Sequence, residues 1–236
     1  KLAEKDLPEE LRQNHANPTP EDNHDIKFVF ALLEKIKQKY NIDEERIFMQ
    51  GMSNGSMFTT QFEKYFGNIL AGASGAGGSI LNLRQFFDKD WKPVNTAGAV
   101  PVWESKPELN GMPPWCEFDE PTTYKYGRLY WQEINGCHET PQISIIGEDN
   151  MAFYRGKKAD MVYLDIRNRD HGNAFDEAVL GWDYFFSGLR RKSDGTIEDT
   201  GSRIERKGDA FAAAFADGSS IAFWRNEKVE MKAPAV

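Results

Sequence analysis

The alternation of apolar and polar positions divides the first part of the chain into predicted helices and strands. Residues 1–23 are polar and rich in Pro, Glu and Asn, which is typical of a loop or linker. From residue 24 to residue 40, apolar positions recur every three or four residues, which predicts a helix that buries one face. A short apolar run at residues 46–50 predicts a buried strand, and a second helical pattern begins near Ser56.

Apolar strands and helical patterns continue to alternate as far as residue 189. We expect strands at residues 69–74, 100–105 and 161–166, and helices at residues 122–134 and 175–189. Strands that alternate with helices favour a mainly parallel sheet covered by helices on both faces. The fold class predicted from the pattern is therefore α/β.

The pattern changes after residue 191. Residues 193–207 are charged and predict a linker. Two short strands at residues 210–216 and 220–224 flank Asp217-Gly218, a turn typical of a hairpin. We expect three parts: a linker or remnant of an N-terminal portion at residues 1–23, an α/β core at residues 24–191, and a linker with a small β-element at residues 192–236.

A candidate nucleophile lies between the first predicted strand and the helix that follows it. Residues 51–55 read Gly-Met-Ser-Asn-Gly, a G-x-S-x-G pentapeptide centred on Ser53. In a nucleophile elbow the strand turns sharply into the helix, so the serine hydroxyl projects from the edge of the sheet. We expect Gly51 and Gly55 to keep side chains out of this turn, and the backbone N–H of Asn54 to bind an oxyanion.

A serine hydroxyl needs a base within hydrogen-bond reach, and the chain contains 4 histidines. His171 follows the last strand predicted in the core and precedes its last helix. This position matches the chain order serine, acid, histidine of G-x-S-x-G hydrolases. We therefore predict that His171 is the base, because His15, His24 and His138 fall in polar segments or at a helix start.

The carboxylate of such a triad is expected after an intermediate strand, and the strand predicted at residues 100–105 is suitably placed. Glu108 is the first acid after this strand, and it is the predicted third member of the triad. Three acids further along the same segment stay open as alternatives: Glu117, Asp119 and Glu120.

Aromatic residues are dense between residues 103 and 131, beside this acidic segment. Such rings can form a pocket or lid for an acyl or aryl group, and they can equally cover the sheet and one another. We expect Trp103 and Trp115 to contact the substrate, with packing as the alternative.

Composition and charge narrow the possible partners. The 236 residues carry a net charge of -8 with scattered basic residues, which argues against nucleic acid as the main partner. No apolar run is long enough to cross a bilayer, so we expect no membrane partner. Cys116 and Cys137 lack metal-ligand spacing, so we expect no metal; a disulfide between them stays open. We expect no other cofactor, because acyl transfer by a serine and a histidine requires none.

The chain also resembles a known family over residues 25–189. The resemblance is carried by Tyr40-Asn41-Ile42-Asp43, Arg46-Ile47, the pentapeptide at residues 51–55, Trp131 with Asn135-Gly136-Cys137, and His171 followed by Trp182, Asp183 and Phe185. These residues are similar to the polyhydroxybutyrate depolymerase and feruloyl esterase-like family of α/β-hydrolases. The resemblance implies an α/β-hydrolase fold, a secreted serine esterase, and Ser53 and His171 as nucleophile and base.

Two departures from the family pattern affect the site. The family's acid closes a Pro-Val-x-x-x-x-Gly-x-x-Asp pattern, which places Asn110 where the aspartate belongs when it is aligned on Pro101-Val102. Asparagine cannot stabilise an imidazolium by charge, so Glu108 or a later acid has to substitute. The family fold also has strands and a His-Gly loop before the helix at His24, and we expect an N-terminal portion or a partner chain to supply them.

These features predict a serine esterase that hydrolyses hydroxycinnamoyl, acetyl or short hydroxyalkanoate esters through an acyl-enzyme. The substrate is expected to be a small molecule or an ester linked to a polysaccharide. The alternative is a degenerate, non-catalytic hydrolase-fold protein that binds a ligand or glycan. A peptidase is disfavoured because nothing resembles an anchor for a peptide terminus. We expect a secreted or cell-surface location, and a cytoplasmic one stays open.

Overall fold

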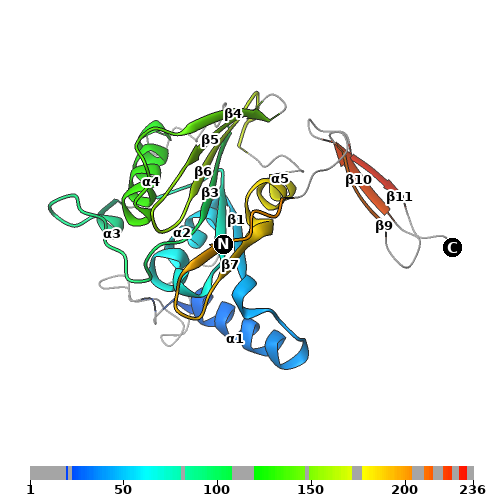
Figure 1. Ribbon diagram of the computed structural model, residues 1–236, viewed down its shortest axis with the longest axis horizontal. Helices are drawn as coiled ribbons and strands as arrows, with labels where there is room; N and C mark the ends of the chain where they lie inside the picture. Colours follow the sequence, from blue (N-terminus) through cyan, green and yellow to red (C-terminus); the bar gives the residue numbers. More distant parts are fainter. Residues whose placement is uncertain are drawn as a thin grey trace, which may run out of the picture. The chain divides into compact units, whose positions relative to one another are not determined.

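The computed structural model has an α/β fold built around a six-stranded sheet (Figure 1). The structure describes Pro20 and residues 23–80, 83–107, 120–146, 149–171, 177–203, 210–214, 220–224 and 229–232. The chain forms two compact units, Lys1–Glu44 and Glu45–Val236. The division into three parts at residues 23 and 191 stays a prediction.

The first unit contains helix α1 (His24–Lys39), which confirms the helix predicted from residue 24. Asn23 caps its start, because the Asn23 side-chain oxygen accepts hydrogen bonds from the N–H groups of Asp25 (2.9 Å) and Ile26 (3.3 Å). Such a cap satisfies donors that have no carbonyl partner inside the helix. Near the other end, the Lys37 ammonium pairs with Glu44 at 2.7 Å.

The main sheet of the second unit has the strand order β1-β2-β3-β6-β5-β4. Its parallel strands are β1 (Phe48–Met52), β2 (Gly72–Ala76), β3 (Val102–Pro107) and β6 (Met161–Ile166). Two antiparallel strands, β5 (Asp149–Tyr154) and β4 (Gln142–Ile146), extend the sheet beyond β6. The predicted mainly parallel sheet is confirmed, and β1 is one edge of the sheet that the described residues form.

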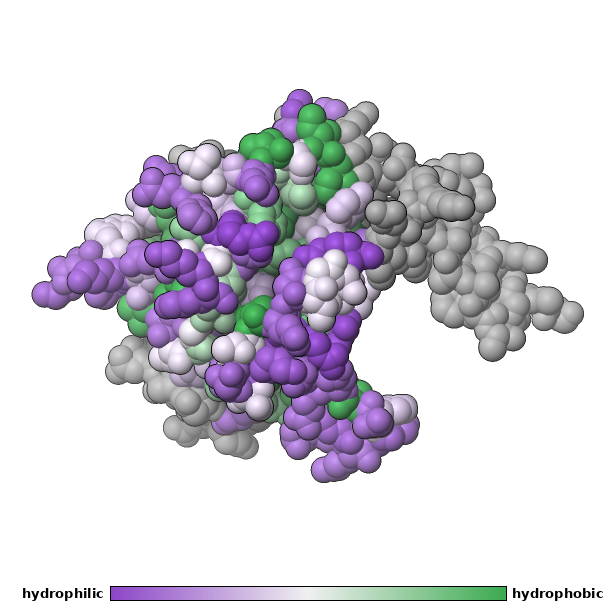
Figure 2. All heavy atoms as spheres, viewed as in Figure 1, coloured by the Kyte–Doolittle hydropathy of each residue, from purple (hydrophilic) through white to green (hydrophobic). Residues whose placement is uncertain are grey.

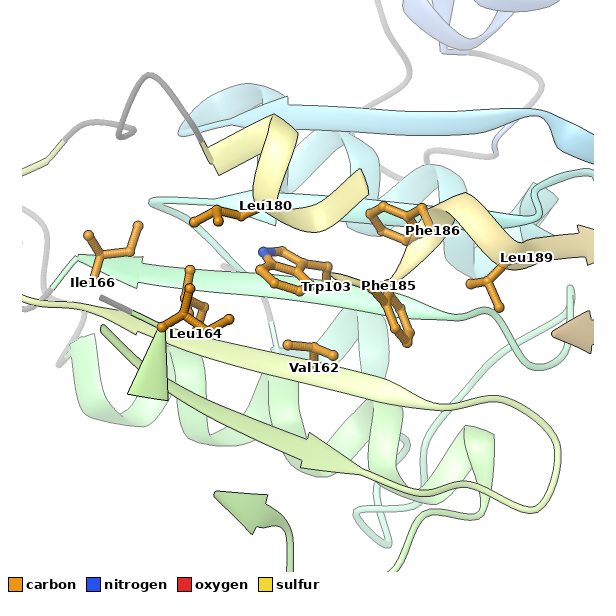
Figure 3. Packing of buried hydrophobic residues seen from close by; sticks show 9 residues of the cluster. Trp103, Val162, Leu164, Ile166, Leu180, Phe185, Phe186 and Leu189 are labelled. Atoms are coloured by element: carbon orange, nitrogen blue, oxygen red, sulfur yellow. The ribbon is translucent and has the colours of Figure 1, made fainter. Parts of the chain in front are cut away.

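Helices cover both faces of this sheet. They are α2 (Asn54–Phe66), α3 (Leu83–Phe86), α4 (Glu120–Asn135) and α5 (Glu177–Tyr184). The aligned residues Gly75, Glu104 and Tyr163 share the face covered by α2 and α4. The neighbouring Trp103 points to the opposite face, where α5 lies (Figure 3). No helix in the described part of the chain is both long and apolar enough to span a membrane.

A buried apolar cluster fills the space between the sheet and α5 (Figure 3). Its buried members are Trp103, Ile146, Val162, Leu164, Ile166, Leu180, Phe185, Phe186 and Leu189. Aromatic side chains bury about 150–250 Å² each, so the three rings of this set dominate the cluster. The Trp103 indole N–H donates to Ser105 Oγ at 2.9 Å, which satisfies its polar atom inside the core.

A short hairpin follows α5 and replaces part of the predicted linker at residues 193–207. A turn, η6 (Phe186–Gly188), leads into β7 (Leu189–Arg191), which pairs with β8 (Ile197–Asp199). The buried guanidinium of Arg191 donates to the carbonyl oxygens of Leu70 and Ala99, which precede β2 and β3, and to that of Gly195 in the turn of the hairpin itself. The linker prediction is wrong at residues 197–199, because the charged residues of β8 stay exposed while this strand pairs with the largely buried β7.

Predicted strand boundaries shift where a short 3-10 turn continues an apolar run. Arg46 belongs to η4 (Glu44–Arg46) and not to β1; it donates to Ser187 O at 3.2 Å, and its guanidinium lies 5.4 Å from the Trp182 ring centroid. Likewise, η5 (Gly67–Ile69) occupies the start of the strand predicted at residues 69–74. Apolar periodicity over so few residues does not separate a turn from a strand.

The antiparallel strands β4 and β5 were not predicted from the sequence. On β4, Ile143 is 66% exposed and Ile145 is 71% exposed, whereas Ile146 is buried in the core cluster. Figure 2 shows the resulting hydrophobic patch over β4, at the top of the view. The sequence Gln142-Ile143-Ser144-Ile145 does alternate polar and apolar residues, so a strand signal was present and was missed.

A separate antiparallel sheet is formed by β9 (Ala210–Ala214), β10 (Ser220–Trp224) and β11 (Val229–Lys232). The pairing of β9 with β10 confirms the hairpin predicted there, while β11 was not predicted. The predicted Asp217-Gly218 turn lies outside the described residues.

Candidate active site

Strand β1 and helix α2 meet in a sharp turn at Ser53. The backbone of Ser53 has φ 54° and ψ -118°, a combination that residues with a side chain rarely adopt. Its N–H donates to Ala76 O at 2.8 Å, at the end of β2, and its carbonyl accepts from Met57 N–H at 3.2 Å. Such strain persists only where the surrounding structure imposes it, and it occurs preferentially at functional sites.

Gly51 is the motif glycine that this turn requires. A Cβ atom at Gly51 would lie 2.1 Å from the carbonyl oxygen of Gly55. Gly78, which follows β2, is similarly restricted, because its Cβ would lie 2.8 Å from the carbonyl oxygen of Ser53. A Cβ at Gly55 would meet open space. The expectation that both motif glycines exclude side chains therefore holds for Gly51 and is wrong for Gly55.

His171 lies against Ser53. The distance from His171 Nε2 to Ser53 Oγ is 2.9 Å. The backbone N–H of His171 donates to Asp170 Oδ1 at 2.7 Å, and the backbone of Gly77, with φ 62°, passes beside the ring. The two side chains meet because the carboxyl ends of parallel strands lie at the same edge of a sheet, and Ser53 follows β1 while His171 follows β6.

Asn54 is the first residue of α2, directly after Ser53. Its N–H therefore belongs to the first helical turn, where main-chain donors have no carbonyl partner within the helix. The partial positive charge of a helix N-terminus also favours an anion at this position. An oxyanion that forms on an acyl group attached to Ser53 would be stabilised there.

Ser56 ties the turn to the glycine-rich segment after β2, a role that sequence reasoning did not predict. The Ser56 side chain is fully buried, and its hydroxyl donates to Gly78 O at 2.8 Å. It packs on Gly75 of β2, where a Cβ would lie 2.5 Å from Ser56 Oγ. The available signal was a small polar residue three positions after Ser53, on the helix face that covers the sheet.

The predicted triad acid, Glu108, lies outside the described residues, as do Asn110, Glu117 and Asp119. Glu120 is the first residue of α4. Strand β3 ends at Pro107, which is paired with Ile166 at the end of β6. The chain therefore leaves β3 beside the point where β6 leads towards His171.

The described aromatic residues between residues 103 and 131 mostly pack the core. Trp103 is fully buried beneath α5 and offers no surface to a substrate, contrary to the sequence-based expectation. The reason is that the side chain of Trp103 points to the face of the sheet that α5 covers. Tyr124, Tyr130 and Trp131 of α4 are buried as well. Trp115 lies outside the described residues.

Two buried carboxyl groups lie between α2 and the sheet, below the turn. A Cβ at Gly75 would lie 3.2 Å from both carboxyl oxygens of Glu104, which places this group against β2. Burial, together with the charge of Glu177, raises the pKa of Glu104 to about 8. Burial, together with the charge of Glu104, raises the pKa of Glu63 well above its ordinary value. Glu104 is mainly protonated at neutral pH, so it does not suit the charge-stabilising role of a triad acid.

Within the described ranges, no group of three or more His, Cys, Asp or Glu side chains is arranged to hold a metal ion. Cys137 is a free thiol, and burial beside Asp160 raises its pKa to about 12, which keeps it protonated and unreactive.

The parallel sheet and the strand, elbow and helix around Ser53 define an α/β-hydrolase-like fold. No family model matches the chain, and no curated protein matches it in sequence. A thermostable esterase of known crystal structure is similar at a TM-score of 0.38 and 18% identity, with 71% of this chain and 32% of that chain covered. The chain thus spans about a third of that esterase's length. The function has to be inferred from the geometry around Ser53.

Replacing Gly51 by alanine should destabilise the protein, whereas replacing Gly55 by alanine should not. Gly51→Ala forces a methyl group against a backbone carbonyl of α2, and overpacking of this kind costs about 1–3 kcal/mol. Gly55→Ala places a methyl group in open space within a helix, where alanine is favoured over glycine by about 0.5–1 kcal/mol. Urea unfolding of the two variants measures both effects, and equal destabilisation would contradict this geometry.

Stability should fall as the pH rises towards 8, because native Glu104 keeps a proton that the unfolded chain releases above about pH 4.5. This contribution is fully present below pH 4.5 and is lost as the pH rises through the folded pKa of about 8. Each such group contributes a slope of about 1.4 kcal/mol per pH unit in this window. Glu104→Gln should flatten the slope, as measured by urea midpoints across the window.

The matched control for this experiment is Glu198→Gln, which changes an exposed carboxylate on β8. It should leave the slope at the wild-type value. If Glu104→Gln also retains the wild-type slope, Glu104 is not the protonated group.

Proposed function

We propose that this protein is a carboxylic ester hydrolase that acts through an acyl-enzyme formed on Ser53. The observation that carries the proposal is the 2.9 Å distance between Ser53 Oγ and His171 Nε2 at a strained strand-to-helix turn. A hydroxyl in this position can pass its proton to the imidazole as it attacks a carbonyl carbon. The first turn of α2 gives an adjacent donor for the charge that develops.

In the proposed reaction, Ser53 Oγ attacks the ester carbonyl carbon while His171 Nε2 accepts the hydroxyl proton. The tetrahedral oxyanion accepts a hydrogen bond from the Asn54 N–H. The intermediate then collapses, His171 returns the proton to the departing alcohol, and the acyl group stays on Ser53. Water attacks this acyl group with His171 again as the base, and the free acid leaves. No step in this sequence requires a metal or an organic cofactor.

Glu108 is the proposed partner of the His171 imidazole. The pairing of Pro107 with Ile166 supports this choice, because the chain leaves β3 beside the strand that leads to His171. A carboxylate there would orient the ring and stabilise its cation. Glu104, the nearest described carboxyl group on β3, is disfavoured because burial raises its pKa to about 8.

A second oxyanion donor is part of the proposal, since one such donor typically contributes about 2.7–4 kcal/mol of transition-state stabilisation. The sequence resemblance assigns it to a His-Gly loop that precedes the first helix in the family. We propose that an N-terminal portion or a partner chain supplies this loop and pairs with β1, which is an edge strand of the described sheet.

The substrate class is proposed from the sequence resemblance alone. It comprises hydroxycinnamoyl, acetyl and short hydroxyalkanoate esters, either as small molecules or linked to a polysaccharide. The same resemblance is the reason to propose secretion. A net charge of -8 fits neutral or cationic substrates better than polyanions.

Ser53→Ala and His171→Ala should each lower the rate of 4-nitrophenyl acetate hydrolysis by about a thousandfold or more, because each removes one half of the activated nucleophile. A fluorophosphonate probe should label wild-type protein on Ser53 and leave Ser53→Ala unlabelled. His138→Ala is the matched histidine control and should keep wild-type activity. If the wild-type protein neither labels nor cleaves the ester, the non-catalytic binding protein becomes the better proposal.

Glu108→Gln should lower kcat by about a hundredfold or more with little change in KM, because the amide cannot stabilise the imidazolium. Glu117→Gln and Asp119→Asn remove neighbouring charges of the same sign and should have small effects. Steady-state kinetics of the three variants checks this assignment. A large loss in either control, with Glu108→Gln active, would transfer the role to that residue.

A further inference from the structure

A turn after α3 holds the tryptophan side chain of Trp91 at the surface. Asp88 Oδ1 accepts hydrogen bonds from the N–H groups of Asp90 and Lys92, both at 2.9 Å. The backbone of Asp88 donates to Lys92 O at 2.9 Å and accepts from Trp91 N–H at 3.1 Å. Within this turn Trp91 has φ 58°, although its side chain is bulky and 58% exposed. Such a backbone conformation lowers the folding stability by about 1–3 kcal/mol, and here it accompanies an exposed aromatic ring.

The Trp91 ring forms an aromatic platform with Tyr126 of α4. The two ring centroids are 5.4 Å apart, and their planes differ by 27°, so the rings are stacked. Phe87 supports both from the protein side, with centroid distances of 5.9 Å to each ring. Figure 1 shows the segment after α3 beside α4, in agreement with these contacts.

This platform forms one wall of a hollow of about 550 Å³ on the outer side of α4. The volume falls within the range of about 300–1,000 Å³ typical of small-molecule sites. Glu133 and Glu139 line the same hollow together with Gln132. The Gln132 amide is held in place, because it accepts from Arg128 at 2.9 Å and donates to His138 O at 3.4 Å. Neither Ser53 nor His171 lines the hollow, so it is separate from the candidate active site.

The aromatic and acidic residues that line the hollow indicate which kind of ligand it can bind. The charged side chains among its described lining residues are both carboxylates, which disfavours anions such as phosphates or uronic acids. An organic cation is the competing ligand, because it can lie over a single ring face and be attracted by the two carboxylates. The Gln132 amide beside them favours a ligand that also offers hydroxyl groups for hydrogen bonding. A neutral sugar matches both parts, since its C–H face packs on flat rings and its hydroxyls donate to carboxylates.

We propose that the platform of Trp91 and Tyr126, with Glu133 and Glu139, is a binding site for a neutral saccharide. Binding there does not depend on the proposed esterase activity. In a protein that also cleaves esters linked to polysaccharides, the site would hold the carbohydrate chain while Ser53 reaches an acyl group elsewhere on it.

Isothermal titration calorimetry of the full chain with xylotetraose and cellotetraose tests the proposal. At least one of these neutral oligosaccharides should bind the wild-type protein, and Trp91→Gly should weaken that binding by about tenfold or more. Glycine adopts a positive φ without strain, which offsets the lost ring contacts, so this variant should fold. Tyr184→Ala, which removes a 50% exposed ring from α5, is the matched control and should bind like wild type.

The remaining outcomes separate this inference from the esterase proposal. Hydrolysis of 4-nitrophenyl acetate by Trp91→Gly should equal that of wild type, because the small ester does not use the platform. Saccharide binding without labelling of Ser53 would overturn the esterase proposal and leave the saccharide site standing. The saccharide site is overturned if neither oligosaccharide binds, if Trp91→Gly binds as tightly as wild type, or if choline chloride binds in their place.

Discussion

Helix α2 lies so close to strands β1 and β2 that side chains are excluded where they meet. A Cβ would come within 2.1 Å of a backbone oxygen at Gly51 and within 2.8 Å of one at Gly78, and at Gly75 it would lie 2.5 Å from Ser56 Oγ. This close contact allows β1 to turn directly into α2, and the turn forces Ser53 into its unusual backbone conformation. The position of the serine hydroxyl, the helix N-terminus behind it and the burial of Glu104 beneath it all depend on this packing.

The parts of the fold that could be predicted are those whose signal is local. The strand at residues 161–166 is apolar and β-branched, and it was predicted with its observed bounds. The pentapeptide around Ser53 identified the turn, because the turn leaves no room for a side chain at Gly51. Strand β4 was missed although Gln142-Ile143-Ser144-Ile145 alternates polar and apolar residues, and β8 was missed because it is a short, charged partner of β7. Both exist because a neighbouring strand is present to pair with them, which is a property of the tertiary structure.

Trp103 and Trp91 show that the placement of a single side chain also depends on the tertiary structure. Trp103 stood next to the predicted acidic segment and was expected to contact substrate, whereas nothing in the sequence singled out Trp91. The structure buries Trp103 because a strand alternates its side chains between faces, and the face of each residue is fixed only when the register with β2 and β6 is known. Trp91 lies in a polar turn where a single-sequence pattern gives no reason to expect an ordered ring. Its importance emerges only from its stacking on Tyr126 and from its backbone conformation.

The left-handed backbone at Trp91 also makes it possible to distinguish selection for folding stability from selection for function, which usually favour the same residue. At most positions, the residue that best fits the fold also serves the function. At this position the backbone conformation favours glycine or asparagine, and the contacts of the ring with Tyr126 and Phe87 offset that preference. Because the two effects nearly cancel in the free energy of folding, a use for the exposed ring can decide which residue is kept at position 91.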